Sequence, residues 1–362
     1  MKYQKEFRQS SRLKNCLEKI QKVTTRPWRI MEVCGGQTNT IMRYGLDQLV
    51  KPIEFVHGPG CPVCVTPIHI IDMALELAKS EEVIFTSFGD MLRVPGSHEN
   101  LLSIKAKGAK VQMVYSPLEA VDLAERNRDK QVVFFAIGFE TTAPLNALSV
   151  LEAKRRNLKN FSILVSQVLV PPAVKTLFSD PQIHVDALIA AGHVCTIKGE
   201  SEYIPLIQQF QKPIVITGFE PLDLLDGLYH CIQQLEKGQY KLENQYRRSV
   251  RPQGNPIAQK AVDQIFEVAD INWRGLGNIE KSGLRLKREY REFDAYERFK
   301  LNASSQEVCN ECQSGDILKG LIKPPQCPAF GKACTPLNPL GAPMVSEEGA
   351  CQAYYRFKRR DQ

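Results

Sequence analysis

From residue 28 onward, the sequence alternates short apolar runs with longer stretches in which apolar and polar positions recur at helical spacing. The apolar runs are rich in β-branched and aromatic residues, as buried strands are. Continuous apolar strands that alternate with amphipathic helices are typical of parallel sheets covered by helices on both faces. The expected strands cover residues 28–33, 53–58, 83–89, 111–116, 132–139, 162–168, 187–192 and 214–219.

The expected helices include residues 70–80, 117–127, 143–157 and 201–211. Such a series of strand and helix units would also suit a closed (β/α)8 barrel. Apolar residues are sparse at 124–130, however, which favours a boundary between domains there. We therefore expect an α/β protein with two parallel-sheet domains, over residues 1–128 and 129–250, and keep the barrel as the alternative.

The pattern changes after about residue 250, where helical stretches continue but the alternation with strands stops. From Cys309 the chain is rich in cysteine, proline and glycine and has little apolar periodicity. Such a segment cannot build much of a core, so a bound metal is expected to stabilise it. Residues 251–362 are thus predicted to form a helical and cysteine-rich region.

Composition and charge narrow the class of protein. The chain has 362 residues, 43% hydrophobic and 24% charged, with a net charge of +7. The basic clusters at 285–291 and 356–360 are interpreted as solvated surface, since nothing in the sequence has the spacing of a nucleic-acid-binding motif. The longest apolar run, 132–139, is far shorter than the roughly 20 residues of a membrane span. We expect a cytoplasmic protein that binds neither nucleic acid nor membrane. Stable disulfides are rare there, so the eleven cysteines indicate metal or redox chemistry.

Polar residues follow the expected strands at their carboxyl ends, where parallel α/β folds place functional loops. The residues concerned are Cys34, the loop of Cys61 and Cys64, Asp90, Glu140, His193 and Glu220, with His57 closing the second strand. Any one of them is weak support, because loops often begin with a polar residue. Their accumulation on one predicted sheet edge favours a functional site.

Cys34 is expected at a turn between a strand and a helix. A thiol at the amino end of a helix meets the positive end of the helix dipole, which favours the thiolate at neutral pH. A buried structural cysteine is the alternative.

The stretch "HGPGCPVCVTP" at 57–67 places Cys61 and Cys64 in a loop of prolines and glycines. This spacing suits a dithiol that cycles with a disulfide, which is the preferred interpretation. A tetrahedral zinc site would need two further ligands, which His57 and Cys34 could supply. A structural role for the two cysteines is the third possibility.

The cysteines near the carboxyl terminus form a second group. Counted from Cys312, the spacing is C-x14-C-x6-C-x16-C, and the ligands would be Cys312, Cys327, Cys334 and Cys351. Zinc ribbons usually have two short Cys-x-x-Cys pairs, whereas only Cys309 and Cys312 stand at that spacing here. Thiolates spread through loops suit a cubane iron–sulfur cluster. Zinc remains open from the spacing alone.

Several motifs together resemble the HypD family of nickel–iron hydrogenase maturation factors. They are "MEVCGG", "HGPGCPVCVTP", "SFGDMLRVPG", "GFETT", "GFEPLDLL", "ENQYRR", "WRGLG" and "MVSEEGAC", in that order between residues 28 and 355. The resemblance implies two α/β domains and a region that carries a [4Fe–4S] cluster. It also implies a scaffold on which iron acquires cyanide and carbon monoxide ligands, together with a small HypC-type chaperone and a HypE-type cyanide donor.

Carried over by position, the resemblance assigns a role to each cysteine set. Cys34 would bind the nascent iron centre, and Cys61 and Cys64 would be the redox dithiol beside it. The four cysteines from Cys312 to Cys351 would hold the cluster, and the pairing with Cys309 leaves the first of these ligands open. The family commonly has C-G-x-H-x-H after the first cysteine, whereas Gln37 and Asn39 stand here. Because amides cannot shuttle protons as histidine does, His57 and His193 are the remaining candidates for that role.

Two other functions are compatible with the same residues. The first is a thiol–disulfide reductase supplied with electrons by the iron–sulfur cluster, with a disulfide of a partner protein as substrate. The second is a zinc-stabilised interaction module without redox chemistry. Iron in excess of the cluster, with cyanide and carbonyl infrared bands, would identify the scaffold.

Overall fold

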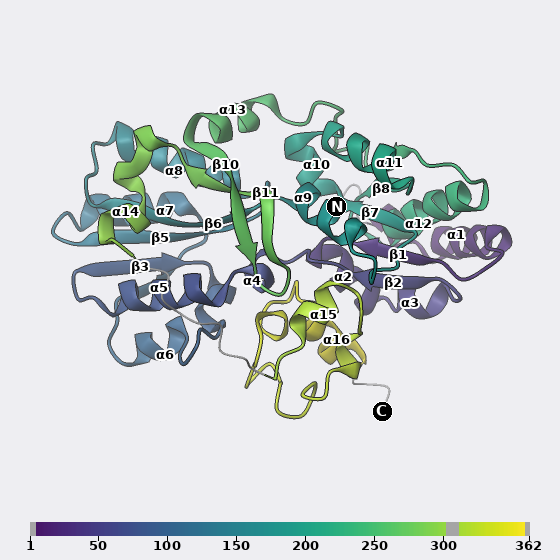
Figure 1. Cartoon of the computed structure of the whole chain (residues 1–362), viewed down its shortest axis with the longest axis horizontal. Coiled ribbons are helices and arrows are strands. Elements are labelled where there is room, and N and C mark those ends of the chain that lie inside the picture. The colour runs from purple at the N-terminus through teal and green to yellow at the C-terminus, as the bar shows by residue number, and fades with distance from the viewer. Residues whose placement is uncertain (1–4, 302–310, 359–362) are drawn as a thin grey trace.

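The computed structural model describes residues 5–301 and 311–358 and has the predicted α/β architecture, with two sheets side by side (Figure 1). The first sheet is parallel throughout. Its strands, in spatial order, are β2 (Glu54–His57), β1 (Arg29–Glu32), β7 (Ala187–Ala191), β8 (Ile214–Thr217) and β9 (Leu242–Asn244).

The second sheet has a parallel part and an antiparallel hairpin at one edge. Its spatial order is β10 (Phe266–Trp273), β11 (Gly277–Leu286), β6 (Phe161–Val168), β5 (Gln131–Gly138), β3 (Val83–Ser87) and β4 (Val111–Met113). β10 and β11 form the hairpin, and β11 runs antiparallel to β6.

The sheets exchange strands along the chain. β1 and β2 pair with β7 and β8, whereas β3 and β4 pair with β5 and β6. The sheets therefore do not coincide with the consecutive ranges 1–128 and 129–250, and the strands form two open sheets instead of a barrel. Apolar runs show that a strand is buried, but they do not say which strand lies beside it, because parallel neighbours can be distant in sequence.

Helices cover both faces of each sheet. Their bounds are α1 (Ser10–Val23), α2 (Gly35–Arg43), α3 (Leu46–Leu49), α4 (Pro62–Val65), α5 (Ile68–Lys79), α6 (Leu101–Ala106), α7 (Pro117–Arg126), α8 (Ala143–Arg155), α9 (Val170–Ser179), α10 (Gly192–Lys198), α11 (Ile204–Phe210), α12 (Pro221–Glu236), α13 (Pro256–Ile265), α14 (Ala295–Phe299), α15 (Ser314–Leu318) and α16 (Ala350–Lys358). Short 3-10 helices are η1 (Lys5–Phe7), η2 (Gly89–Arg93), η3 (Ser201–Tyr203), η4 (Arg288–Phe293), η5 (Pro324–Gln326) and η6 (Ala342–Met344).

Alternation of side chains along each strand divides the core into layers. On β5, Val132 and Phe134 join the cluster that includes residues of α7 and α8. Val133 and Phe135 point to the opposite face and join the cluster that includes α5 and α6. Both faces of β5 are therefore buried, which explains why its sequence is continuously apolar.

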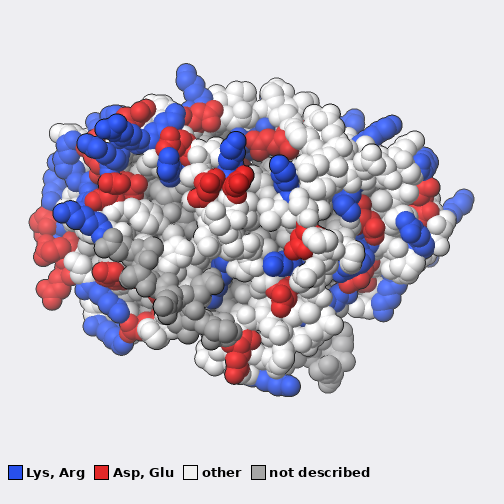
Figure 2. Space-filling model, viewed as in Figure 1, with Lys and Arg blue, Asp and Glu red and all other residues white. Residues whose placement is uncertain are grey.

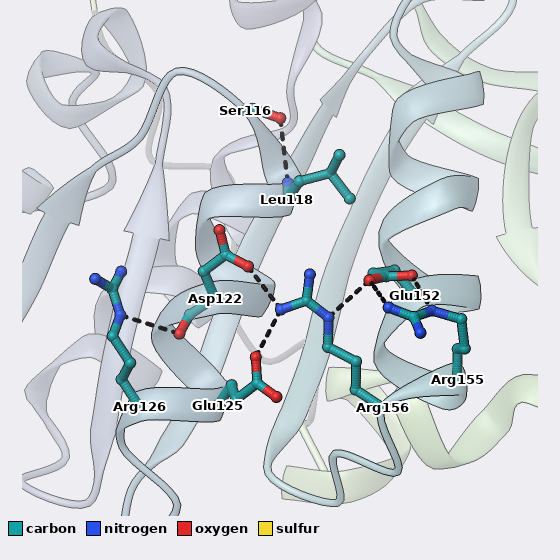
Figure 3. Close-up of polar contacts among 8 residues, drawn as sticks. All are labelled: Ser116, Leu118, Asp122, Glu125, Arg126, Glu152, Arg155 and Arg156. Atoms are coloured by element: carbon teal, nitrogen blue, oxygen red, sulfur yellow. Dashed lines mark hydrogen bonds and ion pairs between the residues drawn. The ribbon is translucent and has the colours of Figure 1, made fainter.

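α7 and α8 are also joined at the surface by ion pairs (Figure 3). Arg156 donates to Asp122 at 2.7 Å, to Glu125 at 2.8 Å and to Glu152 at 2.7 Å, so one guanidinium bridges the two helices. The Ser116 hydroxyl oxygen caps α7 by accepting from the Leu118 amide at 3.2 Å. Figure 2 shows basic and acidic side chains interspersed at this end of the molecule.

The cysteine-rich segment lies beside both sheets, where α15 and α16 are drawn in yellow-green and yellow (Figure 1). α16 packs against α2, and η6 packs against α4. These contacts connect the carboxyl-terminal cysteines with the helices that follow Cys34 and carry Cys64. Within residues 5–301 and 311–358, no helix has the length and apolar character of a membrane span.

Candidate functional site

Cys34 and His193 come together at one edge of the first sheet. Cys34 follows β1 and His193 follows β7, and these parallel strands are neighbours. Parallel neighbours present their carboxyl ends at the same edge, so loops distant in sequence meet there. The Cys34 Sγ lies 3.6 Å from the His193 Nδ1. The structure thus brings these two sequence-predicted residues into direct contact.

Burial determines the protonation of this pair. The Cys34 side chain is 4% exposed, and burial raises the pKa of its thiol, with the charge of Glu348 adding to the effect. Backbone N–H groups at the start of α2 act in the opposite direction but do not prevail. Burial also lowers the pKa of His193 to about 4. At neutral pH the pair is therefore a thiol beside a neutral imidazole, contrary to the thiolate expected from the helix dipole.

A buried carboxylate organises the backbone of Cys34. Glu32 is fully buried, and its Oε2 accepts the Cys34 amide proton at 2.8 Å. Its Oε1 accepts from the Thr38 hydroxyl at 2.5 Å and lies 2.7 Å from the His57 Nδ1. His57 therefore contacts Glu32, and its ring lies edge-on to Tyr354, with ring centroids 5.6 Å apart. Sequence reasoning missed Glu32, although a glutamate inside an apolar strand needs buried partners and was a signal.

The loop that carries Cys61 and Cys64 lies directly against Cys34. Cys61 and Cys64 are joined by a disulfide, with Cα atoms 5.2 Å apart. The Gly35 amide donates to the Gly60 carbonyl at 2.9 Å. A Cβ on Gly60 would come within 2.3 Å of the Cys34 nitrogen, so only glycine permits this approach. As a disulfide, the two sulfurs are not available as zinc ligands.

The carboxyl-terminal cysteines surround one cavity. Its lining includes Cys312, Cys327, Cys334 and Cys351, with apolar side chains such as Ile317, Phe330 and Met344. The Leu340 amide donates to the Cys334 Sγ at 3.4 Å. Four converging thiols, an apolar wall and an N–H donor to sulfur are the donor set that a cubane iron–sulfur cluster takes. The residues present therefore fit a [4Fe–4S] cluster, and Cys309 lies outside the described residues.

Within the described ranges, no three or more His, Cys, Asp or Glu side chains form a group that could hold a single metal ion, the four thiols around this cavity included.

Residues 345–349 connect this cavity with both sheets. The Ser346 hydroxyl donates to the Asp90 Oδ2 at 2.9 Å, beyond β3 of the second sheet. On the other side, a Cβ on Gly35 would lie 2.2 Å from the Glu348 Cβ, so the segment touches the first turn of α2. Gly341, Pro343 and Met344 line the cavity, and η6, to which the last two belong, packs against α4. The three sets of cysteines are therefore connected by direct packing.

The family model described as "HypD: Hydrogenase formation hypA family" matches residues 11–358. The chain belongs to the HypD family. It is 46% identical to the hydrogenase maturation factor HypD of Escherichia coli (strain K12), over 93% of this chain and 91% of that protein. It is 44% identical to HypD of Rhodobacter capsulatus, over 99% and 98%. The protein is therefore a hydrogenase maturation factor of the HypD family.

The amides of Gln37 and Asn39 make structural contacts. Gln37 is buried, and its Nε2 donates to the Thr217 hydroxyl at 2.8 Å and the Ala190 carbonyl at 3.2 Å. Gln37 therefore ties α2 to the ends of β7 and β8. The Asn39 Nδ2 donates to the Glu347 carbonyl at 3.4 Å.

The two glutamates predicted at strand ends have partners other than Cys34. Glu220 caps α12 and forms an ion pair with Arg8, with oxygen to nitrogen distances of 2.5 and 2.9 Å. Glu140 is 2% exposed, and its Oε1 accepts the Val170 amide proton at 2.9 Å. Their contacts connect helices and loops around the sheets. Their position at the end of a strand could be predicted from the sequence, but the residues that they contact could not.

Glu140 should make stability depend on pH. Burial raises the pKa of its carboxyl from 4.5 to about 8, although the backbone N–H groups of Glu140 and Val170 act to lower it. The folded state then keeps this proton to higher pH than the unfolded chain. Its contribution to stability is present below the unfolded pKa and is lost as the pH rises through about 8, by at most about 1.4 kcal/mol per pH unit. Glutamine has no carboxyl to ionise. The melting temperature of Glu140→Gln should therefore depend less on pH than that of the parent protein, between pH 4.5 and about 8.

The control for this measurement is Glu119→Gln, which removes an exposed carboxyl from α7. Melting temperatures of the three proteins are compared from pH 5 to 9. A Glu140→Gln variant with the same pH slope as the parent protein would show that Glu140 ionises in the folded state like an ordinary carboxyl.

Proposed function

We propose that this chain is the scaffold on which the Fe(CN)2CO group of nickel–iron hydrogenase is assembled, with Cys34 as the attachment point. The iron is cargo that leaves with its ligands. The observation that carries the proposal is the convergence of three cysteine sets. Cys34 touches His193, the glycine loop of the disulfide lies on the Cys34 backbone, and the four-thiol cavity borders η6, which packs on α4.

Cys34 suits low-spin iron, because thiolates are soft ligands. Iron binding requires loss of the thiol proton, and the neutral His193 imidazole, with its Nδ1 3.6 Å from the Sγ, is placed to accept it. His193 is half-buried, and the proton that it takes must leave its ring for solvent before the imidazole is neutral again. Burial of Cys34 restricts the access of water and oxygen to the bound iron.

The Cys61 and Cys64 pair supplies electrons when reduced. Its oxidation forms one S–S bond and releases two electrons and two protons, and the reverse step consumes them. The pair is a disulfide in the structure, and a return to the dithiol in each cycle needs a reductant that supplies two electrons, with two protons. A [4Fe–4S] cluster bound by Cys312, Cys327, Cys334 and Cys351 would exchange single electrons. Rigid proline and glycine positions keep the two thiols close enough to rejoin.

The partners in this proposal are a small HypC-type chaperone and a HypE-type cyanide donor. The cytoplasm is the proposed location, where thiols such as Cys34 stay reduced. The deciding experiment is an infrared spectrum of the anaerobically purified complex with the small chaperone. Two cyanide bands and one carbonyl band, with iron in excess of four per chain, are expected. A complex that lacks both the bands and the extra iron would refute the scaffold.

A thiol–disulfide reductase is the second candidate function. It is favoured by η6, because this element lines the four-thiol cavity and packs against the helix that carries Cys64. Its substrate would be a disulfide of a partner protein. This function predicts reduction of such a disulfide by the cluster-containing protein, with iron limited to the cluster and no cyanide or carbonyl bands.

Loss of one cluster ligand should remove the colour of the protein. Cys327→Ala and Cys334→Ala each leave three thiolates, and the cavity region has little apolar core of its own. The anaerobic parent protein should be brown, with about four irons and four sulfides per chain. Both variants should be colourless, with faster proteolysis of residues 311–358. Iron, sulfide and visible absorbance are the measurements.

The matched control is Cys16→Ala, since Cys16 is 7% exposed, close to the 9% and 8% of Cys327 and Cys334. It should stay brown. A colourless parent protein with one equivalent of zinc would instead establish the zinc-stabilised module.

A further inference from the structure

An aromatic stack lies behind the Cys34 and His193 pair. The His193 ring packs on Phe219, with centroids 5.1 Å apart and planes inclined by 39°. Phe219 in turn meets Tyr246 edge to face, at 6.0 Å and 84°. Phe219 follows β8, and Tyr246 follows β9, the edge strand of the first sheet. The stack therefore runs from the sheet edge to the thiol that is proposed to carry iron.

Glycines at two strand ends let Tyr246 come this close. A Cβ on Gly192, which precedes His193, would lie 2.5 Å from the Tyr246 Cδ1. A Cβ on Gly218, which precedes Phe219, would lie 2.6 Å from the Tyr246 Cε2. Such distances are well inside van der Waals contact, so only glycine fits at both positions. The tyrosine ring thus packs against the two backbone turns that carry His193 and Phe219.

The Tyr246 ring also packs against one member of a charged pair. The Arg248 guanidinium lies over the tyrosine ring, 4.4 Å from its centroid. Arg248 is fixed by two bonds to the carboxylate of Asp223, at 2.8 and 2.5 Å, and Asp223 is fully buried. A buried bidentate pair has one preferred geometry. It therefore fixes the guanidinium against which the ring packs.

Phe219 is also fixed from the side of Cys34. The Thr40 hydroxyl of α2 donates to the Phe219 carbonyl at 2.7 Å. A Cβ on Gly36 would lie 3.2 Å from the Phe219 Cδ1 and 3.6 Å from the Cys34 Sγ. Phe219 thus lies between α2, the helix that follows Cys34, and Tyr246. A movement of Tyr246 would therefore displace Phe219 and, through it, His193.

We propose that Tyr246 is a positioning residue that holds His193 against Cys34 through Phe219. The inference rests on the proposed role of Cys34, but its consequence concerns the protein before iron binds. The ring of Tyr246 does this by packing, since the contacts to Phe219, Gly192 and Gly218 are made by ring carbons. Neither the phenol hydroxyl nor a charge is required.

The test is the rate at which iodoacetamide alkylates Cys34, measured by peptide mass spectrometry at one pH in cluster-containing protein without partners. In Tyr246→Leu, Phe219 and His193 can move away from the buried thiol, and alkylation should be about fivefold faster, within the range of energies that couple neighbouring side chains. Tyr246→Phe retains the ring and should react at the parent rate. Phe178→Leu, which breaks an unrelated edge-to-face pair with Phe210, is the matched control and should leave the rate unchanged.

A double-mutant cycle shows whether Tyr246 acts through His193. His193→Ala removes the imidazole that contacts the thiol and sets a new background rate. Adding Tyr246→Leu to it should then change nothing further, because the restrained group is gone. The proposal would be overturned if the rate change in the double variant were the product of the changes in the two single variants. It would also be overturned if Tyr246→Phe were alkylated as fast as Tyr246→Leu. Because the readout needs no iron at Cys34, missing infrared bands in the parent complex would refute the scaffold without affecting this result.

Discussion

Cys34→Ala should fold and keep its brown colour, yet show no cyanide or carbonyl infrared bands after purification with the small chaperone. The alanine keeps the backbone contacts, because Glu32 binds the amide of residue 34 and Gly60 accepts the amide proton of Gly35. Removing one buried sulfur should cost about 1 kcal/mol, the typical effect of a single substitution. The lost group is the one proposed ligand at this sheet edge, so the effect on bound iron should be complete.

The matched control is Cys231→Ala, which removes a fully buried thiol from α12. Its infrared bands and its maturation of hydrogenase should equal those of the parent protein. Three measurements on each variant separate the possibilities: the melting temperature, the visible absorbance of the cluster and the infrared spectrum. An unfolded or colourless Cys34→Ala variant would make Cys34 a structural residue. Full-strength bands in a folded variant would place the iron elsewhere.

Most of the parallel strands could be predicted because they are buried on both faces. Each apolar run expected to be a strand overlaps one, from β1 to β8. The pairing of those strands could not be predicted in the same way. β1 lies between β2 and β7, although β7 is more than 150 residues further along the chain. Burial depends on a strand's own sequence, whereas pairing depends on how distant segments pack together.

The hairpin β10–β11 was not predicted from the sequence, because β10 is not buried on both faces. Along β10 most side chains are exposed or half-buried, and only Phe266 and Trp273 at its ends are buried. An edge strand has a solvated face, so it lacks the continuous apolar run that marks a central strand. β9, at the edge of the first sheet, is short and half-buried and was missed as well.

At the site, residues with distinctive chemistry could be predicted, whereas their supports could not. Cysteine and histidine at strand ends singled out Cys34 and His193, which are in contact. Glu32 and Tyr246 contribute by where they lie, and that depends on the fold. The protonation of Cys34 was mispredicted because the dipole of α2 can be inferred from sequence, whereas the degree of burial, which dominates, cannot.

Cys61→Ser and Cys64→Ser should each fold, keep the cluster and fail to mature hydrogenase. The pair closes a loop with a sequence separation of 3. A cross-link over so short a loop contributes roughly 2 kcal/mol by the chain-entropy estimate, too little to decide whether a chain of this size folds. Serine cannot form the disulfide, so each variant lacks the two-electron step of the proposed cycle. In a titration of thiol accessibility against redox potential, the parent protein should show a two-electron transition at Cys61 and Cys64 that both variants lack.

Val63→Ala is the matched control, because it alters a residue between Cys61 and Cys64 while leaving both cysteines in place. It should keep the two-electron transition and most of the hydrogenase maturation. A metal-only role for the pair predicts a different outcome: thiols masked in the cluster-containing protein and no two-electron transition. If either serine variant matured hydrogenase at the parent level, the dithiol could not be the source of electrons. The loop would then serve to shape the backbone at Cys34, through the contact between Gly60 and Gly35.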